Sequence, residues 1–313
     1  MEIFGPVPSR RLGISLGINN IPHKVCSYSC LYCQVGKGVT IEVERQEFYK
    51  PGFLVEKVRE TLSKIKNNKE FPDYLTIVPD GEPTLDINLG TLINSLKTFN
   101  IPIAVITNAT LLSLPEVRAE LNAADYVSVK CDTFNENVWR KINIPHKSLD
   151  LQTILKGTQQ FAKEFQGKLV TETMLLKGVN DKADDLTKTA EIISTLNPDT
   201  SFISIPTRPT AFRKADKPDE QTLTMAYDIF SERIENVELL TGYEGDAFAS
   251  SGNFSEDVLS ITAVHPMRED AVRKLLEKSG GTLDELSDLV KQKLLERVNY
   301  RGENFYLRKF RRS

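Results

Sequence analysis

The sequence lacks several features that would define a simple functional class. Its 313 residues include only four cysteines and 8% aromatic residues, and the net charge is -3 because 40 basic residues are offset by 43 acidic ones. This balance excludes a generic polyanion binder, so contact with nucleic acid or a membrane would need a local patch. No run of about 18 apolar residues occurs, and no membrane partner is expected. Met1 to Pro8 has two prolines and no long apolar run, so we expect no signal peptide and predict a cytoplasmic location.

The four cysteines are unevenly placed. Cys26, Cys30 and Cys33 fall within eight positions, and Cys131 stands alone. Clustered cysteines outside a small secreted chain bind metal or do redox chemistry more often than they form disulfides. A closed zinc site needs four protein ligands, which His23 could complete, although Cys-x3-Cys-x2-Cys is not a common zinc spacing. An iron-sulfur cube held by three thiolates instead leaves one iron open to a small molecule such as S-adenosylmethionine.

The residues around these cysteines resemble the radical S-adenosylmethionine (radical SAM) superfamily. Its CxxxCxΦC signature matches the run from Cys26 to Cys33, with Tyr32 as the aromatic residue. The resemblance implies a [4Fe-4S] cluster on the three thiolates and S-adenosylmethionine (SAM) bound to the open iron. It also implies reductive cleavage of SAM to a 5'-deoxyadenosyl radical, with a flavodoxin or ferredoxin as electron donor. The segment Phe4 to Gly13 resembles a subgroup known as uncharacterised Fe-S oxidoreductases.

Short β-rich runs alternate with amphipathic helices, which is the pattern of a parallel α/β sheet. Helices are predicted at Phe53 to Ile65 and Leu149 to Phe165. Six strands are predicted, at Ile14 to Ile18, Tyr74 to Val78, Ile101 to Ile106, Tyr126 to Cys131, Leu169 to Leu175 and Phe202 to Ile205. Six units are too few for a closed barrel, and the resemblance implies a partial (β/α)6 TIM-like barrel within a first domain of residues 1–245.

Ligands of such barrels lie at the carboxyl ends of the strands. After the second predicted strand, Asp80-Gly81-Glu82-Pro83 resembles the Gly-Gly-Glu-Pro motif that binds the methionine amino group of SAM, with Asp80 in place of the first glycine. A glycine lets the backbone approach a ligand, and a carboxylate pairs with an ammonium group. An ordinary turn is the alternative. After the third strand, Thr107 and Asn108 resemble a pair expected to contact the ribose or carboxylate of SAM.

Polar and apolar residues alternate in the fourth predicted strand, and successive side chains of a strand point to opposite faces. Ser128, Lys130 and Asp132 are therefore predicted to face the cavity. Lys130 and Asp132 become candidates for the ribose hydroxyls or the methionine carboxylate. Cys131 would point toward the helices as a small buried apolar residue.

Two further residues are candidates for the substrate. Glu172, in the fifth predicted strand, is a candidate to face the cavity as a substrate-binding or proton-transfer group. Arg208 follows the sixth strand at the barrel mouth, where a guanidinium can hold a carboxylate or phosphate. A surface ion pair is the alternative interpretation of both. Arg10 and Arg11 precede the barrel and could cover the same mouth.

The alternation stops after about Gly252, and a second domain is predicted over residues 253–313. Ser255 to Ser260 reads as a helix start or linker, and Met267 to Ser279 as an amphipathic helix that Gly280-Gly281 ends. Thr282 and Glu285 form a capping box that starts another helix. Leu294 to Arg308 reads as a β-hairpin. Helix, helix and hairpin in this order resemble a winged helix-turn-helix domain.

Winged helices often bind nucleic acid, and the chain ends in a local basic patch. Its residues are Arg308, Lys309, Arg311 and Arg312. Against this, the second helix carries three acidic residues, which would repel phosphates. They are Asp284, Glu285 and Asp288.

The sequence therefore predicts a radical SAM enzyme whose winged helix presents an RNA, a peptide or protein, or a small molecule. Only Cys131 remains beyond the motif. A second cysteine-ligated cluster, as in the tRNA wyosine synthesis enzyme, is therefore not expected. The alternative is a non-enzymatic winged-helix nucleic-acid binder in which the three cysteines and His23 hold zinc.

Overall fold

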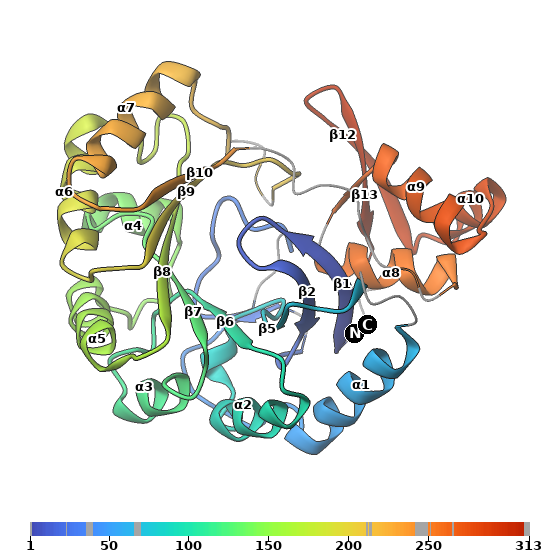
Figure 1. Cartoon of the computed structure of the whole chain (residues 1–313). Coiled ribbons are helices and arrows are strands. Elements are labelled where there is room, and N and C mark those ends of the chain that lie inside the picture. The colour runs from blue at the N-terminus through green and yellow to red at the C-terminus, as the bar shows by residue number, and fades with distance from the viewer. Residues whose placement is uncertain are drawn as a thin grey trace.

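The structure is a computed structural model that describes residues 2–22, 24–35, 40–65, 70–210, 212, 215–241, 250, 252–264 and 266–309. Its largest element is a curled sheet of eight strands in the order β1-β2-β5-β6-β7-β8-β9-β10, with helices over its convex face (Figure 1). The C-terminal helices and strands lie beside the β1 edge of this sheet (Figure 1). The predicted half-barrel is confirmed.

All six predicted strands are present, and they run parallel to one another. They are β2 (Gly13–Ile18), β5 (Tyr74–Ile77), β6 (Ile103–Thr107), β7 (Tyr126–Lys130), β8 (Lys168–Met174) and β9 (Thr200–Ser204). Two strands of this sheet were not predicted: β10 (Val237–Leu240), parallel to β9, and β1 (Ile3–Ser9), antiparallel to β2. Pro6 and Pro8 conceal β1 in the sequence, because a proline suits only an edge strand.

Helices cover the convex face and bury the main apolar core against it. They are α1 (Pro51–Lys64), α2 (Leu89–Leu96), α3 (Pro115–Leu121), α4 (Glu136–Ile142), α5 (Leu151–Glu164), α6 (Ala183–Ser194) and α7 (Glu220–Ser231), with short 3-10 turns η2 (Pro83–Leu85) and η3 (Lys97–Phe99). Side chains cap several of them; Asp150 Oδ2, for example, accepts from Thr153 N at 2.7 Å at the start of α5. Trp139 and Phe161 are among the largest side chains fully buried in this layer.

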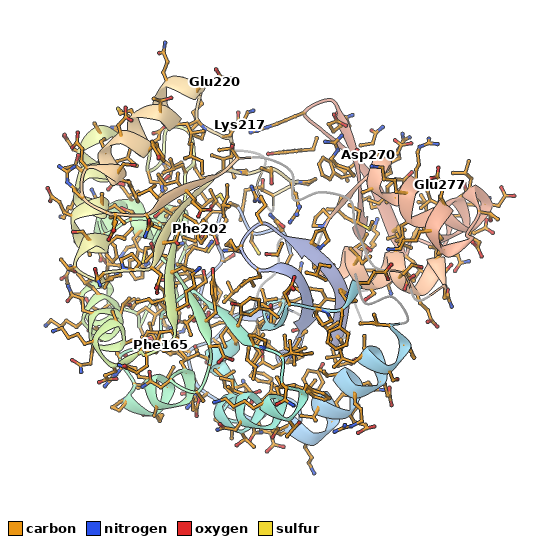
Figure 2. The ribbon with its side chains drawn as sticks, in the orientation of Figure 1. Phe165, Phe202, Lys217, Glu220, Asp270 and Glu277 are labelled. Carbon is orange, nitrogen blue, oxygen red and sulfur yellow. The ribbon has the colours of Figure 1, made fainter. Side chains whose placement is uncertain are left out.

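A second apolar cluster fills the inside of the curled sheet. Its members come from five strands and from the tip of the β1–β2 hairpin, and they are Leu12, Ala104, Tyr126, Val170, Phe202 and Leu240. Phe202 can be located on the concave side of the sheet in Figure 2. Leu12 is 3% exposed, so the hairpin tip is packed into the half-barrel rather than lying outside it.

The C-terminal residues form three helices and a small antiparallel sheet. The elements are α8 (Phe254–Val264), β11 (Met267–Arg268), α9 (Glu269–Ser279), α10 (Leu283–Lys291), β12 (Leu295–Tyr300) and β13 (Glu303–Arg308), with sheet order β11-β13-β12. The predicted helices, hairpin and Thr282–Glu285 capping box are present. Ser255 to Ser260 lies within α8, and β11 was not predicted. The winged-helix assignment and the domain boundaries stay predictions.

The apolar core of this C-terminal segment includes one residue of the half-barrel, Val7 of β1. Lys278 Nζ also lies 2.7 Å from Glu70 Oε1, which joins α9 to the barrel side. Two residues of the predicted basic patch, Arg311 and Arg312, lie outside the described residues, as does His23. No helix in the described part of the chain is long and apolar enough to cross a membrane.

We predict that Gly157→Ala destabilises the protein although alanine is the better helix former. A Cβ at position 157 of α5 would lie 2.3 Å from Ser113 N, so the helix would have to move off the backbone beside it. We expect a loss of about 1–3 kcal/mol in the free energy of unfolding, as in other overpacked cores. Urea unfolding followed by circular dichroism measures it.

Gly52→Ala in α1 is the matched control, because its Cβ would meet nothing within 4 Å. It should leave stability equal or raise it by up to about 1 kcal/mol. Equal stability of Gly157→Ala and the wild type would contradict the close packing of α5.

Candidate functional site

A cavity of about 310 Å³ opens inside the curled sheet, between the β1–β2 hairpin tip and the ends of the parallel strands. Five of the predicted site residues line it: Tyr32, Cys33, Lys130, Glu172 and Arg208. Arg10 and Arg11 line it as well, from the hairpin tip. The other predicted residues lie behind this wall, where they contact one another: Cys26, Cys30, Gly81, Glu82, Thr107, Asn108 and Asp132.

The cysteine loop is anchored to the end of α4. Ser29 N donates to Asn143 O at 3.0 Å, and Leu31 N donates to Ile142 O at 2.9 Å. The loop begins at β3 (Val25–Cys26), which pairs with β4 (Thr40–Ile41). Cys26, Cys30 and Cys33 are free thiols and half-buried. Three thiols are thus held in one loop, with Cys33 at the cavity wall.

Two of these thiols are costly to ionise in the protein alone. Burial raises the pKa of Cys26, and the Glu82 carboxylate adds to the effect. Burial and the nearby Asp132 raise the pKa of Cys30 to about 12. Such groups become thiolates only beside a strong positive centre, and bound metal ions deprotonate a thiol outright. The donor set therefore fits a metal cofactor.

Three thiols suit a cluster better than a closed zinc site, which needs four protein ligands around one ion. An iron-sulfur cube bonds each thiolate to a different iron, so its ligands stand farther apart. The three cysteines fit that group.

Glu82 is buried between the ends of β5 and β6, and its carboxylate accepts hydrogen bonds from both. Its Oε1 accepts from Thr84 N at 3.1 Å, from Thr84 Oγ1 at 2.7 Å and from Thr107 Oγ1 at 2.5 Å, and its Oε2 accepts from Asn108 N at 2.7 Å. The residue is 1% exposed. Burial raises its pKa, and these hydrogen bonds oppose the rise. Glu82 therefore ties the loop after β5 to the end of β6, and its contact with an ammonium group stays a prediction.

Gly81 is required by a close approach of two backbones. A Cβ at this position would lie 1.8 Å from Val25 O, the residue before Cys26. Glu82 N donates to the same oxygen at 3.1 Å. The loop after β5 thus rests directly on the start of the cysteine loop. Asp80, which stands in place of the first glycine of the motif, lines the cavity, and its backbone N donates to Asn19 Oδ1 at 3.2 Å.

Asp132 connects the cysteine loop to β8. Its Oδ2 accepts from the Tyr32 hydroxyl and, at 2.7 Å, from Asn143 Nδ2, and its Oδ1 accepts from Met174 N at 2.9 Å. Burial raises its pKa. Its predicted contact with the ribose or carboxylate stays a prediction. Asn143 was missed by the sequence analysis, because nothing local to this helix end points to a cysteine.

Lys130, Glu172 and Arg11 form a buried ion network on the cavity floor. Lys130 Nζ lies 3.3 Å from Glu172 Oε1, the Arg11 guanidinium contacts Glu172 Oε2, and Ser204 Oγ donates to Glu172 Oε1 at 3.0 Å. Glu172 is 8% exposed, so the surface-pair interpretation is wrong for this residue. Burial would raise its pKa, but the two cations hold it well below its usual range. A carboxylate with so low a pKa is a poor proton acceptor at neutral pH, which favours a binding role.

Lys130 stays protonated in this network. Burial would lower its pKa, but the charges of Glu172 and Asp132 outweigh burial and raise it. Its ammonium lies 5.3 Å from the centre of the Tyr32 ring. Arg208 is 6% exposed, and its NH1 donates to Gln34 Oε1 at 3.3 Å. Cys131 is 4% exposed and packs in the core on the helix side of the sheet.

Comparison with known proteins agrees with this geometry. The profile of the radical SAM superfamily matches residues 20–191. The UPF0026 protein MJ1312 of Methanocaldococcus jannaschii is 44% identical over 307 residues, 97% of this chain and 95% of that protein. A UPF0026 protein of Helicobacter pylori is 37% identical over 279 residues, 88% of each chain.

Two solved structures share the fold. A radical SAM methyltransferase from Sphaerobacter thermophilus superposes with a TM-score of 0.56 and 15% identity, over 72% of this chain and 66% of that chain. TYW1 with a lysine-pyruvate adduct superposes with a TM-score of 0.54 and 17% identity, over 70% and 74%. At such identities the likeness shows the fold alone.

We predict that Gly81→Ala prevents the three cysteines from holding iron. The new methyl group would meet Val25 O, and relief of that clash would move the loop that carries Cys26. Iron per chain after anaerobic reconstitution should fall to a small fraction of the wild-type value, while Gly52→Ala keeps its iron. Unchanged iron in Gly81→Ala would show that the loops are not in contact.

We predict that Glu172→Gln costs about 3–5 kcal/mol in the free energy of unfolding at pH 7, because two buried cations lose their shared carboxylate. The native pKa of Glu172 lies below its unfolded value of about 4.3. Its stabilisation is therefore complete above about pH 5 and is lost as the pH falls toward the native pKa. The difference between wild type and Glu172→Gln in urea unfolding should shrink from pH 7 to pH 4. A difference that is constant across this range would refute the network.

Proposed function

Since this chain belongs to the radical SAM superfamily and is an enzyme of it, we propose that its cavity is where hydrogen is abstracted from a substrate carbon. A [4Fe-4S] cluster, when bound to Cys26, Cys30 and Cys33, supplies the electron that cleaves SAM to the 5'-deoxyadenosyl radical. The observation that carries the proposal is the cysteine loop itself, whose three free thiols are each half-buried and which reaches the cavity wall at Cys33. The non-enzymatic zinc alternative is not favoured.

The protein's own residues have two kinds of role in this proposal. Tyr32 and Lys130, which line the cavity, contact SAM directly. The residues behind the wall orient the loops that face the cofactor: Gly81, Glu82, Thr107, Asn108 and Asp132. Support for the second role is the set of hydrogen bonds that joins the ends of β5, β6, β7 and β8 to the cysteine loop. The apolar cluster around Leu12 closes the inner end of the half-barrel to water.

The substrate enters the same cavity in this proposal. Arg208 holds a carboxylate or phosphate of the substrate, and Glu172 keeps Arg11 and Lys130 in place. A cavity of about 310 Å³ admits a small molecule or one group of a larger one. We propose that the C-terminal segment presents such a larger substrate, an RNA or a peptide. Comparison of RNA nucleosides and peptide masses from cells with and without the protein tests which it is.

The electron comes from a reduced flavodoxin or ferredoxin in this proposal. A cluster of this kind takes one electron per cleavage, and such carriers deliver single electrons at low potential. Support for this partner is the family requirement for reduction. Complementary surface charge would guide such a docking partner.

We predict that anaerobically purified protein contains iron and sulfide, has the broad visible absorption of a cluster, and forms 5'-deoxyadenosine with SAM and a chemical reductant. Cys30→Ala should abolish both the absorption and the product. Cys131→Ala is the control: its side chain packs on the helix side of the sheet, so product formation should persist. Colourless protein with about one zinc per chain, or product from Cys30→Ala, would overturn the proposal.

A further inference from the structure

Two asparagine side chains, from two different elements, reach the cysteine sulfurs. Asn108 follows β6, and its Nδ2 donates to Cys26 Sγ at 3.6 Å. Asn143 follows the last residue of α4, and its Nδ2 donates to Cys30 Sγ at 3.5 Å. Both distances are ordinary for hydrogen bonds to sulfur. Each contact brings the positive end of an amide dipole to a different thiol.

The orientation of the Asn108 amide is determined by its other partners. Its Oδ1 accepts from Thr110 N at 3.0 Å and from Thr110 Oγ1 at 2.8 Å. A backbone N–H can only donate, so the oxygen must face Thr110 and the NH2 group must face the loop. There Nδ2 also donates to Ser27 Oγ at 2.8 Å. The donor is therefore directed at Cys26 before any cofactor binds.

The Asn143 amide is oriented in the same manner by a carboxylate. Its Nδ2 donates to Asp132 Oδ2 at 2.7 Å, and an ionised carboxylate accepts but does not donate. Asp132 is itself fixed by the Tyr32 hydroxyl and by Met174 N. Asn143 is 2% exposed, so water does not compete for its amide. The second N–H of this group is directed at Cys30 Sγ and at the Tyr32 hydroxyl oxygen, each 3.5 Å from Nδ2.

We propose that the side-chain amides of Asn108 and Asn143 raise the reduction potential of the cluster and make it easier for the electron donor to reduce. Reduction adds one electron, which increases the negative charge on the thiolate ligands without making or breaking a bond. An N–H directed at a ligand sulfur stabilises the more negative, reduced form. Both residues act through the cysteines, so they are positioning residues, and the inference rests on the cluster assignment in the proposed function.

The test is a redox titration of reconstituted full-length protein without SAM or substrate, followed by the electron paramagnetic resonance of the reduced cluster. Asn108→Leu and Asn143→Leu remove the donors. At a fixed solution potential each should lower the ratio of reduced to oxidised cluster roughly two- to tenfold, the range for one ordinary hydrogen bond. The double variant should shift the midpoint further in the negative direction than either single variant.

Asn180→Leu is the matched control. Asn180 is 1% exposed, and its Nδ2 donates to the backbone oxygens of Asp132 and Met174, both at 2.9 Å, rather than to a sulfur. The same substitution at a burial equal to that of Asn143 should leave the midpoint where the wild type has it. Midpoints of Asn108→Leu and Asn143→Leu equal to that of the wild type, at equal iron content, would overturn the inference.

A further variant keeps the inference testable if a leucine variant does not fold. Asn108→Asp retains one oxygen for both Thr110 contacts and replaces the donor with an acceptor beside Cys26. It should shift the midpoint negative, and an unchanged or positive midpoint would refute the proposed role. A wild-type protein that binds no iron would instead contradict the cluster assignment, so the two failures are distinguishable.

Discussion

The candidate site depends on one buried carboxylate. Glu82 is 1% exposed, and a charge in that position is tolerable only because four hydrogen bonds meet it. Those bonds join the loop after β5 to Thr107 and Asn108 at the end of β6. Asn108 in turn directs its amide at Cys26, and Gly81, the neighbour of Glu82, lets the same loop rest on Val25. Loss of this carboxylate would separate two strand ends and the cysteine loop together.

A half-barrel has an open side, and in this protein the N-terminal hairpin covers part of it. At the tip between β1 and β2, Leu12 packs in the apolar cluster inside the sheet, and Arg11 forms an ion pair with Glu172. Adjacent residues of one turn, one apolar and one charged, therefore complete both the apolar cluster and the ion network. Arg11 and Lys130 keep Glu172 ionised, and Glu172 keeps both cations on the cavity floor, so the charges facing a ligand are fixed before it arrives.

Much of this could be predicted from local patterns. The period of two in a strand placed Lys130 and Cys131 on opposite faces, and the six strands with their helices followed from periodicity. The placement of Glu82 and Asn108 at adjacent strand ends followed from the parallel order. The contacts that could not be predicted join residues far apart in the sequence. Arg11 contacts Glu172 across 161 positions, and Asn143 contacts Cys30 across 113 positions. The strand β1 was missed because it contains two prolines, and β10 was missed because it is a mostly exposed edge strand without a run of buried residues.

The same hairpin connects the cavity to the C-terminal segment. Val7 of β1 belongs to the apolar core that α8, α9 and α10 share, and four residues later in the chain Arg11 reaches the cavity floor. A second connection is the ion pair between Arg301, at the β12–β13 turn, and Asp216, beside a smaller cavity of about 200 Å³ that Thr207 and Tyr300 help to line. Packed cores transmit strain, so β1 is a continuous physical link between the C-terminal segment and Arg11. The segment that we propose presents the substrate is therefore joined through one hairpin to a residue of the cavity floor.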